Sequence, residues 1–329
     1  MTPISLAVVL LALLYAFLNG INDSSNIVAT MISSRALSLR GALGLTAIAE
    51  FLGPFILGIA VSRTIGPEFV QSAVISTHVI LAAVASAIIW ILVASSLGFP
   101  SSSSHALIGG LIGAAIISAG VHAIKLAGLG KILLFLFVSP LIGFVVGLLI
   151  FKILKALSRN ATPKINIFFR QIQILMVIIL GLSHGSNDAP KTMGMITLAL
   201  LADKYLPTFS VPTWVILLSA LAIAAGTAVG GQRLIHTVGN KFYRIAPIDA
   251  FSTQLSSAMI VVTATLAGGP VSTSQIISSA IMGTGAGERA NKVRWKIAQD
   301  IGFAWLLTIP TTALVAVLIY KILTILLAK

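Results

Sequence analysis

Long apolar stretches, separated by short polar interruptions, make up nearly the whole chain. Most of them reach the roughly 20 residues that a helix needs to cross the hydrocarbon core of a bilayer. The pattern predicts helical segments over residues 4–33, 41–62, 78–97, 106–119, 131–153, 171–201, 213–233, 251–268, 276–287 and 301–327. Polar residues fall inside two of these segments, at 19–25 and 184–190. We expect the helix to be interrupted at both places.

Two polar motifs recur along the chain. GINDSSN at residues 20–26 matches GSNDAPK at 185–191 with an offset of 165, and GFPSSSSHALIGGLIG at 98–113 matches GGPVSTSQIISSAIMG at 268–283 with an offset of 170. Pro140 and Pro310 keep that second offset. Asn-Asp pairs, prolines and serines rarely recur at a constant spacing by chance. The chain is therefore interpreted as two repeats, 1–154 and 171–329, joined by a basic linker at 155–170.

The repeats are predicted to have opposite orientations in the membrane. Each Ser-rich stretch follows a proline and precedes a new helix, as in a hairpin tip. Whether the hairpin turns back or crosses twice, each half makes an odd number of net crossings, so the second half is inverted. With both termini outside, 14 of the 21 Lys and Arg residues lie inside, 6 lie outside, and Lys191 remains within the membrane. The positive-inside rule favours this orientation, with a cytoplasmic linker in a multi-pass plasma-membrane protein.

These features predict a fold class. It is an all-α polytopic membrane protein, an inverted-topology repeat with discontinuous helices and two Ser/Thr-tipped hairpins. Inverted repeats with broken helices are typical of secondary transporters, whose binding site lies at the midplane where the repeats meet.

Composition narrows the function classes. Of the 329 residues, 57% are hydrophobic and 9% are charged, against about 25% charged in soluble domains. A soluble enzyme, a nucleic-acid-binding domain and a disordered chain are excluded. The net charge of +13 is therefore assigned to membrane orientation rather than to a nucleic-acid partner. The absence of cysteine excludes thiol catalysis. The chain also lacks a GxxxxGK[ST] motif, so it does not encode ATP-driven pumping.

Ionisable residues at membrane depth mark functional sites. Asp23 and Asp188 each follow an Asn and occupy the same repeat position. Either one alone would suit a helix cap, but the repeated pair indicates a shared site for a small hard cation such as sodium, which prefers oxygen ligands. The candidate sodium ligands are Asn22, Asp23, Asn26, Asn187, Asp188 and Gln254. Glu50 and Asp300 have no repeat partners, and we expect structural or gating roles for them.

The Ser clusters predict an anion site, because hydroxyls, free backbone N–H groups and a helix dipole converge at a helix start. Simple N-capping is the alternative, although it needs one Ser rather than four. The candidate anion ligands are Ser101, Ser102, Ser103, Ser104, Ser272, Thr273, Ser274 and Lys191. Lys191 either pairs with Asp188 or contacts the anion. Buried carboxylates repel an anion unless sodium neutralises them or one of them accepts a proton from hydrogen phosphate. Sulfate has no proton to donate at neutral pH, so the second case favours phosphate over sulfate as the substrate.

These motifs, with the late segment VRWKIAQDIGFAWLLTIP at 293–310, resemble the PiT family of inorganic phosphate transporters over nearly the whole chain. The resemblance implies a cation-coupled phosphate symporter with paired hairpins and a homodimeric state. It also implies that the Asn-Asp motifs and Ser/Thr tips hold cation and phosphate. Members of the family use sodium or protons, and some relatives carry sulfate. Gln275 departs from the family, since many relatives have His there. The short linker fits a prokaryotic protein.

The sequence therefore predicts import of inorganic phosphate by symport with sodium, without an organic cofactor. The expected partners are phosphate, sodium, the lipid bilayer and a second copy of the chain, with no nucleic acid. Proton coupling and sulfate transport stay open. An anion channel fits the Ser-lined helix ends but not the paired carboxylates, unless these bind cations. A membrane enzyme would need a nucleophile and a base, and no His, Ser and carboxylate set recurs at plausible spacing.

Overall fold

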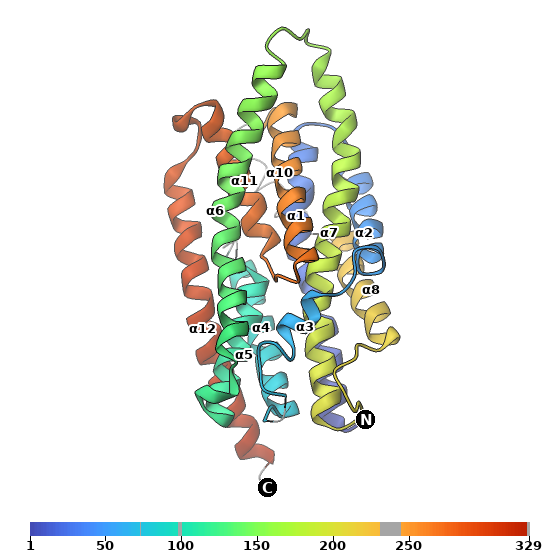
Figure 1. The fold of residues 1–329 in the computed structure, drawn as a ribbon, viewed down its shortest axis with the longest axis vertical. Helices are drawn as coiled ribbons and strands as arrows, with labels where there is room; N and C mark the ends of the chain where they lie inside the picture. Colours follow the sequence, from blue (N-terminus) through green and yellow to red (C-terminus); the bar gives the residue numbers. More distant parts are fainter. Residues whose placement is uncertain (73, 98–100, 231–244, 328–329) are drawn as a thin grey trace.

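The apolar segments fold as helices that run mostly along the long axis of the molecule (Figure 1). The computed structural model describes residues 1–72, 74–97, 101–230 and 245–327, apart from the side chains of residues 297, 300 and 327. The helices are α1 (Pro3–Ser33), α2 (Leu39–Ile56), α3 (Val61–Ile65), α4 (Thr77–Ser96), α5 (Ser103–Ala119), α6 (Leu126–Leu157), α7 (Ile165–Ala202), α8 (Thr213–Val229), α10 (Pro247–Leu266), α11 (Thr273–Glu288) and α12 (Trp295–Leu327), with short 3₁₀ turns η1 (Val121–Ala123) and η2 (Ala290–Lys292).

The expected interruptions of the first and sixth segments are wrong, because α1 and α7 run unbroken through the two Asn-Asp motifs. Small polar side chains in α1 return hydrogen bonds to the helix itself: Ser24 Oγ donates to the Ile21 carbonyl at 2.7 Å and Ser25 Oγ to that of Asn22 at 2.9 Å. Pro190 lies inside α7 without ending it. Polar motif residues satisfied within a bundle do not require unwound backbone. Carbonyls freed by unwinding within these motifs are therefore not a source of cation ligands.

The predicted hairpins are present as two helix pairs. Helices α4 and α5 pack against each other, as do α10 and α11. In Figure 1 the two pairs approach from opposite ends of the molecule, and their tips lie near its middle. The second tip contains Pro270, whereas Pro100 of the first lies outside the described residues. The inverted repeat stays a prediction, which this opposed arrangement favours.

The beginning of α1 and the end of α12 lie at the same end of the molecule, and the loop between α6 and α7 lies at the other (Figure 1). That loop is shorter than the predicted linker, because α6 extends to Leu157 and α7 begins at Ile165. Four of the basic residues used to predict the orientation lie outside the described part of the chain, namely Arg233, Lys241, Arg244 and Lys329.

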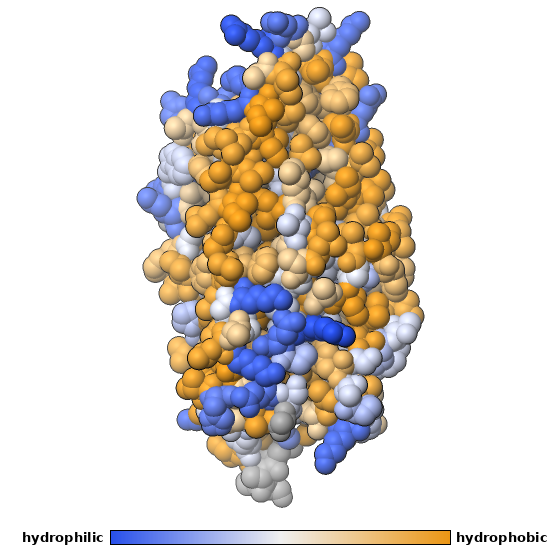
Figure 2. Space-filling view, in the orientation of Figure 1, coloured by the Kyte–Doolittle hydropathy of each residue, from blue (hydrophilic) through white to orange (hydrophobic). Residues whose placement is uncertain are grey.

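The surface is apolar around the middle of the molecule, and charged side chains are buried within a largely hydrophobic interior. Figure 2 shows a broad hydrophobic surface, with polar side chains gathered at the ends and in one patch on this face. Within the described part of the chain, six helices are long and apolar enough to span a membrane. Leu141 and Phe303 are 68% and 65% exposed, whereas Asp188 and Lys191 are only 2% and 1% exposed. Such exposed apolar side chains suit contact with lipid, as expected for a multi-pass membrane protein.

The first residue of each Asn-Asp motif, a glycine, lies where two helices cross closely. A Cβ on Gly20 would lie 2.2 Å from the carbonyl oxygen of Ile223 in α8, and one on Gly185 would lie 2.0 Å from that of Glu50 in α2. Glycine at these crossings lets the backbones approach each other. It brings α1 against α8 and α7 against α2, so each motif helix contacts a helix from the other half of the chain.

Candidate functional site

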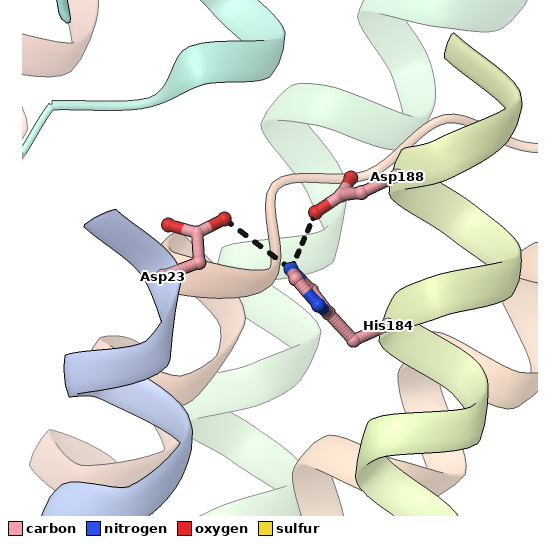
Figure 3. Close-up of side chains that lie close together, drawn as sticks. All are labelled: Asp23, His184 and Asp188. Carbon is pink, nitrogen blue, oxygen red and sulfur yellow. Dashed lines mark hydrogen bonds and ion pairs between the residues drawn. The ribbon is translucent and has the colours of Figure 1, made fainter. Parts of the chain in front are cut away.

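Asp23, His184 and Asp188 meet at the centre of the bundle. His184 and Asp188 project from α7 toward Asp23 on α1 (Figure 3). His184 Nε2 lies 2.7 Å from Asp188 Oδ2 and 3.4 Å from Asp23 Oδ2. One ligand atom from each residue lies within 4.8 Å of the others, and all three residues are buried. This cluster brings together the two aspartates that the repeat predicted to share a site.

Glu50 of α2 holds the other side of the His184 ring. Its Oε1 lies 2.8 Å from His184 Nδ1, and its Oε2 accepts a hydrogen bond of 2.5 Å from Thr227 of α8. Glu50 and His184 are fully buried. The imidazole therefore bridges three carboxylates, and Glu50 fixes its orientation.

Lys191 extends from α7 to both hairpin tips. Its Nζ donates to Asp188 Oδ1, to Ser104 Oγ at 2.5 Å and to the carbonyl oxygen of Val271 at 2.7 Å. Ser104 also donates to the Val271 carbonyl, at 3.1 Å. An ammonium group has three N–H donors, and each has a protein acceptor here. Of the two sequence-based expectations for Lys191, the structure shows the pairing with Asp188.

Asn187 attaches α7 to the second tip. Its amide nitrogen donates to Thr265 Oγ1 at 3.1 Å and to the Gly269 carbonyl at 3.0 Å, and its Oδ1 accepts from the Val271 N–H at 3.1 Å. The side chain therefore fixes the backbone of the loop that leads into α11. This positioning contact is additional to the sodium-ligand role that the sequence predicted for Asn187, which stays a prediction.

The tip of the first hairpin, at the start of α5, is also held in place by hydrogen bonds. Ser102 caps α5, since its Oγ accepts from the N–H of His105 at 3.2 Å. The Ser103 carbonyl accepts a 3.1 Å hydrogen bond from Tyr15 of α1. His105 and Gln275, which occupy equivalent repeat positions, contact each other at 3.4 Å between Nδ1 and Nε2. The tips of the two hairpins therefore meet at the middle of the bundle.

The other predicted site residues lie around this centre. Asn22 is half-buried and its amide approaches Asp23 Oδ1 at 3.4 Å. Gln254 donates to Thr30 Oγ1 at 2.9 Å, two helical turns along α1 from Asp23. The remaining ones are buried in α1 or at the tips, namely Asn26, Ser101, Ser272, Thr273 and Ser274. Asp300, expected to be structural or gating, has a side chain outside the described part of the structure.

Comparison with known proteins decides the family. The sequence profile described as "Phosphate transporter family" matches residues 19–316. The chain belongs to the phosphate transporter family. This confirms the resemblance seen in the motifs. The family and its named relatives are transporters, which also confirms that the chain is a transporter rather than an enzyme.

Relatives of this phosphate transporter family member match along its whole length. The "Probable low-affinity inorganic phosphate transporter" of Rhizobium meliloti is 39% identical over 320 residues, covering 97% of this chain and 96% of that protein. The protein of the same description from Bacillus subtilis is 39% identical over 324 residues, covering 97% of each. A solved structure described as "The sodium-dependent phosphate transporter" matches with a TM-score of 0.91 and 24% identity, over 99% of this chain and 100% of that one. The likeness shows a shared fold.

Among the described residues, the centre of the transporter holds more carboxylates than ammonium groups. Three buried carboxylates, on Asp23, Glu50 and Asp188, surround His184, and among the described residues the ammonium group of Lys191 pairs with Asp188 alone. His184 adds a second positive charge only when it is protonated. Uncompensated charge is costly at membrane depth, and an anion would increase the repulsion. A bound cation is the simplest compensation that this set of oxygen atoms offers.

The sequence analysis does not predict the roles of two residues of this centre, His184 and Tyr15. His184 lies four residues before Asp188, so it occupies the same helix face one turn away, and that spacing was a usable signal. Tyr15 lies eight residues before Asp23 on α1, and its aromatic ring looks like any other apolar position. Glu50 stands out as an acidic residue within an apolar segment, but the sequence does not reveal its partners His184 and Thr227, which lie in distant parts of the chain.

Proposed function

We propose that this transporter imports inorganic phosphate by symport with sodium. One observation carries the proposal: Asp23, His184 and Asp188 place ligand atoms within 4.8 Å of one another, buried beside both hairpin tips. Carboxylate oxygens are good ligands for a small hard cation. The same place is adjacent to the hydroxyl-rich starts of α5 and α11, where an anion would bind. Cation and anion sites in contact provide the coupling that symport needs.

Sodium provides the missing positive charge in this arrangement. Bound at Asp23, with the neighbouring Asn22 and Asn26, it neutralises a carboxylate that would otherwise repel the substrate. Phosphate then binds to hydroxyls and backbone N–H groups at residues 101–104 and 272–274, where two helix N-termini contribute partial positive charge. Each ligand lowers the electrostatic cost of binding the other, so sodium and phosphate occupy the site together.

Because the central cluster lies between the two proposed repeats, relative movement of the repeats provides alternating access to it. The two repeats, including their hairpins, rock about the central cluster and expose it first to one side and then to the other. In this proposal the transporter lies in the plasma membrane with both termini outside and the linker between α6 and α7 in the cytoplasm. Its functional form is a homodimer, as the family resemblance implies.

Uptake into proteoliposomes tests the coupling ion. Labelled phosphate should accumulate when a sodium gradient points inward, and it should not accumulate without sodium, even under an inward proton gradient. A gradient of potassium of equal size is the control for osmotic and potential effects. Equal uptake under a proton gradient in the absence of sodium would reject sodium coupling and leave phosphate transport in place.

Proton coupling is the second candidate, and a specific observation favours it. Both ring nitrogens of His184 are in contact with carboxylates. Nε2 contacts Asp188 and Asp23, and Nδ1 contacts Glu50. A proton on the ring provides the same compensating charge as sodium does at Asp23. The same assay separates the candidates, because proton-driven uptake acidifies the vesicle interior in step with phosphate and continues when sodium is removed.

A further inference from the structure

The ammonium group of Lys191 is bound as a metal cation would be. Its Nζ is in contact with a carboxylate oxygen of Asp188, the hydroxyl of Ser104 at 2.5 Å and the carbonyl oxygen of Val271 at 2.7 Å. The residue is 1% exposed. Carboxylate, hydroxyl and carbonyl oxygens are the ligand types that protein sites for hard cations use. The ligands come from α7 and from both hairpin tips.

The repeat places an equivalent set of groups in the other half. The offset of 165 relates Asp188 to Asp23 and Lys191 to Asn26. The offset of 170 relates Ser104 to Ser274 and Val271 to Ser101. The contact between Ser274 and Asp23 is formed, with Oγ to Oδ1 at 2.7 Å. The two sets therefore share an aspartate and a tip serine. Val271 contributes a backbone carbonyl, which Ser101 also has, so the side-chain difference that bears on a cation is Lys191 against Asn26.

That position changes the chemistry of the site. Lys191 brings its own positive charge and has only donors, whereas Asn26 brings no charge and has an oxygen that can bind a cation. Asn26 is 6% exposed. One turn before Asp23, on the same helix face, the Oδ1 atom of the buried Asn19 has no hydrogen-bond partner among the described residues. Among the described residues, the Asp23 set therefore contains no ammonium group, the neighbouring Asn19 has an unused oxygen, and His184, 3.4 Å from Asp23, carries a positive charge only when it is protonated.

We propose that Lys191 is a built-in cation that permanently fills the second of two repeat-related cation sites, so that only the Asp23 site takes a mobile ion. The proposal rests on the sodium-coupled function above and deepens it. The three N–H donors of Lys191 are used by protein oxygens, so the residue acts through its charge and not as a direct ligand of phosphate. The transporter then couples one sodium ion fewer per phosphate than a symmetric pair of sites would.

Sodium binding to the purified full-length protein tests this directly. Equilibrium binding of radioactive sodium, with inorganic phosphate present, should give one site per chain for the wild type. Lys191→Asn, which copies the first repeat into the second, should give two. Asn26→Lys, the reverse exchange, should give none. Lys131→Asn is the matched control, because Lys131 forms a surface ion pair with Glu68 at 3.0 Å, away from the cluster, and its count should equal that of the wild type.

The coupling ratio gives a second readout. In proteoliposomes, the membrane voltage at which net phosphate flux reverses reports how many sodium ions move with each phosphate. Lys191→Asn should raise that number by one. A wild type that binds two sodium ions per chain overturns the proposal even if the variant fails to fold. A folded Lys191→Asn protein with an unchanged count overturns it as well.

Failure of the proposal is distinguishable from failure of sodium coupling. A wild type that binds no sodium and imports phosphate without it refutes sodium coupling. In that case, Lys191→Asn gaining a sodium site would still support the role of Lys191, and no gain would refute it. A wild type with two sites and sodium-driven uptake keeps the coupling and refutes the built-in cation.

Discussion

Ser274, at the start of α11, donates a hydrogen bond of 2.7 Å to the Asp23 carboxylate of α1. The contact joins the hairpin tip of one repeat to the Asn-Asp motif of the other. Ser104 makes the reciprocal contact by accepting from Lys191, the ion-pair partner of Asp188. The tip of the second hairpin therefore contacts Asp23 directly, whereas the tip of the first reaches Asp188 through Lys191, so movement of either hairpin changes the contacts of one of these carboxylates or of its partner.

We expect Asp23→Asn and Asp188→Asn each to abolish sodium-driven phosphate uptake. Asp23→Asn removes a carboxylate ligand of the mobile sodium, whereas Asp188→Asn leaves the buried ammonium group of Lys191 without its carboxylate partner. Breaking a buried charged pair costs about 3–5 kcal/mol, which at Asp23 corresponds to a loss of sodium affinity of about a hundredfold or more. Uptake in proteoliposomes at a series of sodium concentrations measures the effect. Glu68→Gln, at an exposed ion pair, is the control and should transport normally. Sodium dependence that persists in both Asp variants would disprove the cation-site assignment.

Sulfate should compete poorly for uptake. Hydrogen phosphate carries a proton that it can donate to a carboxylate, whereas sulfate has none at neutral pH. A buried acceptor left without its donor costs about 1–3 kcal/mol, so sulfate should bind about ten- to a hundredfold more weakly. Competition against labelled phosphate measures this, with arsenate, which is protonated in the same way, as the positive control. Equal inhibition by sulfate and arsenate would indicate a general carrier of divalent anions.

Gly185→Ala should destabilise the protein, because the added methyl group would lie 2.0 Å from the Glu50 carbonyl oxygen. Forcing α2 and α7 apart at this crossing should cost about 1–3 kcal/mol and displace Glu50 from His184. Gly44→Ala is the matched control, since nothing lies within 4 Å of its added methyl. Thermal unfolding in detergent and phosphate uptake are the two measurements. Equal stability of the two variants would show that the helix crossing tolerates a side chain.

The Asp203 carboxyl lies at the end of the molecule that holds the N-terminus, and we expect it to make a pH-dependent contribution to the stability of the fold. Burial alone would raise the pKa of this carboxyl, but hydrogen bonds from the hydroxyls of Ser5, Thr77 and Thr2 outweigh it and hold the pKa below its ordinary value. The folded protein therefore favours the ionised form. The stabilisation is present above the ordinary aspartate pKa of about 3.9 and is lost as the pH falls through the lowered value.

The test compares the melting temperatures of the wild type and Asp203→Asn across pH. The variant should melt at a lower temperature near neutral pH, and the difference should shrink as the pH falls below about 4. Thr2→Val, which removes one donor at 2.8 Å, should show a smaller loss with the same pH dependence. A difference that is constant across this range would show that the ionised carboxyl does not stabilise the fold.

The position of the site was accessible from the sequence because polar residues in apolar helices are rare. Asp23, Asp188 and the two Ser-rich tips stood out against their surroundings, and the repeat connected them. The expected breaks in α1 and α7 were wrong for a related reason. Polar residues within an apolar segment do not by themselves require unwinding, because Ser24 and Ser25 donate hydrogen bonds back to their own helix, which stays intact.

By itself the sequence determined that this is a membrane protein, and its motif spacing predicts two similar halves, because hydrophobic length and motif spacing are local properties of the chain. Only the tertiary structure decided which polar groups meet. Glu50 and His184 are separated by 134 positions and touch at 2.8 Å, and Ser274 and Asp23 are separated by 251. Those contacts depend on helix crossings and on opposed hairpins, which pack buried charges against partners that no local pattern specifies.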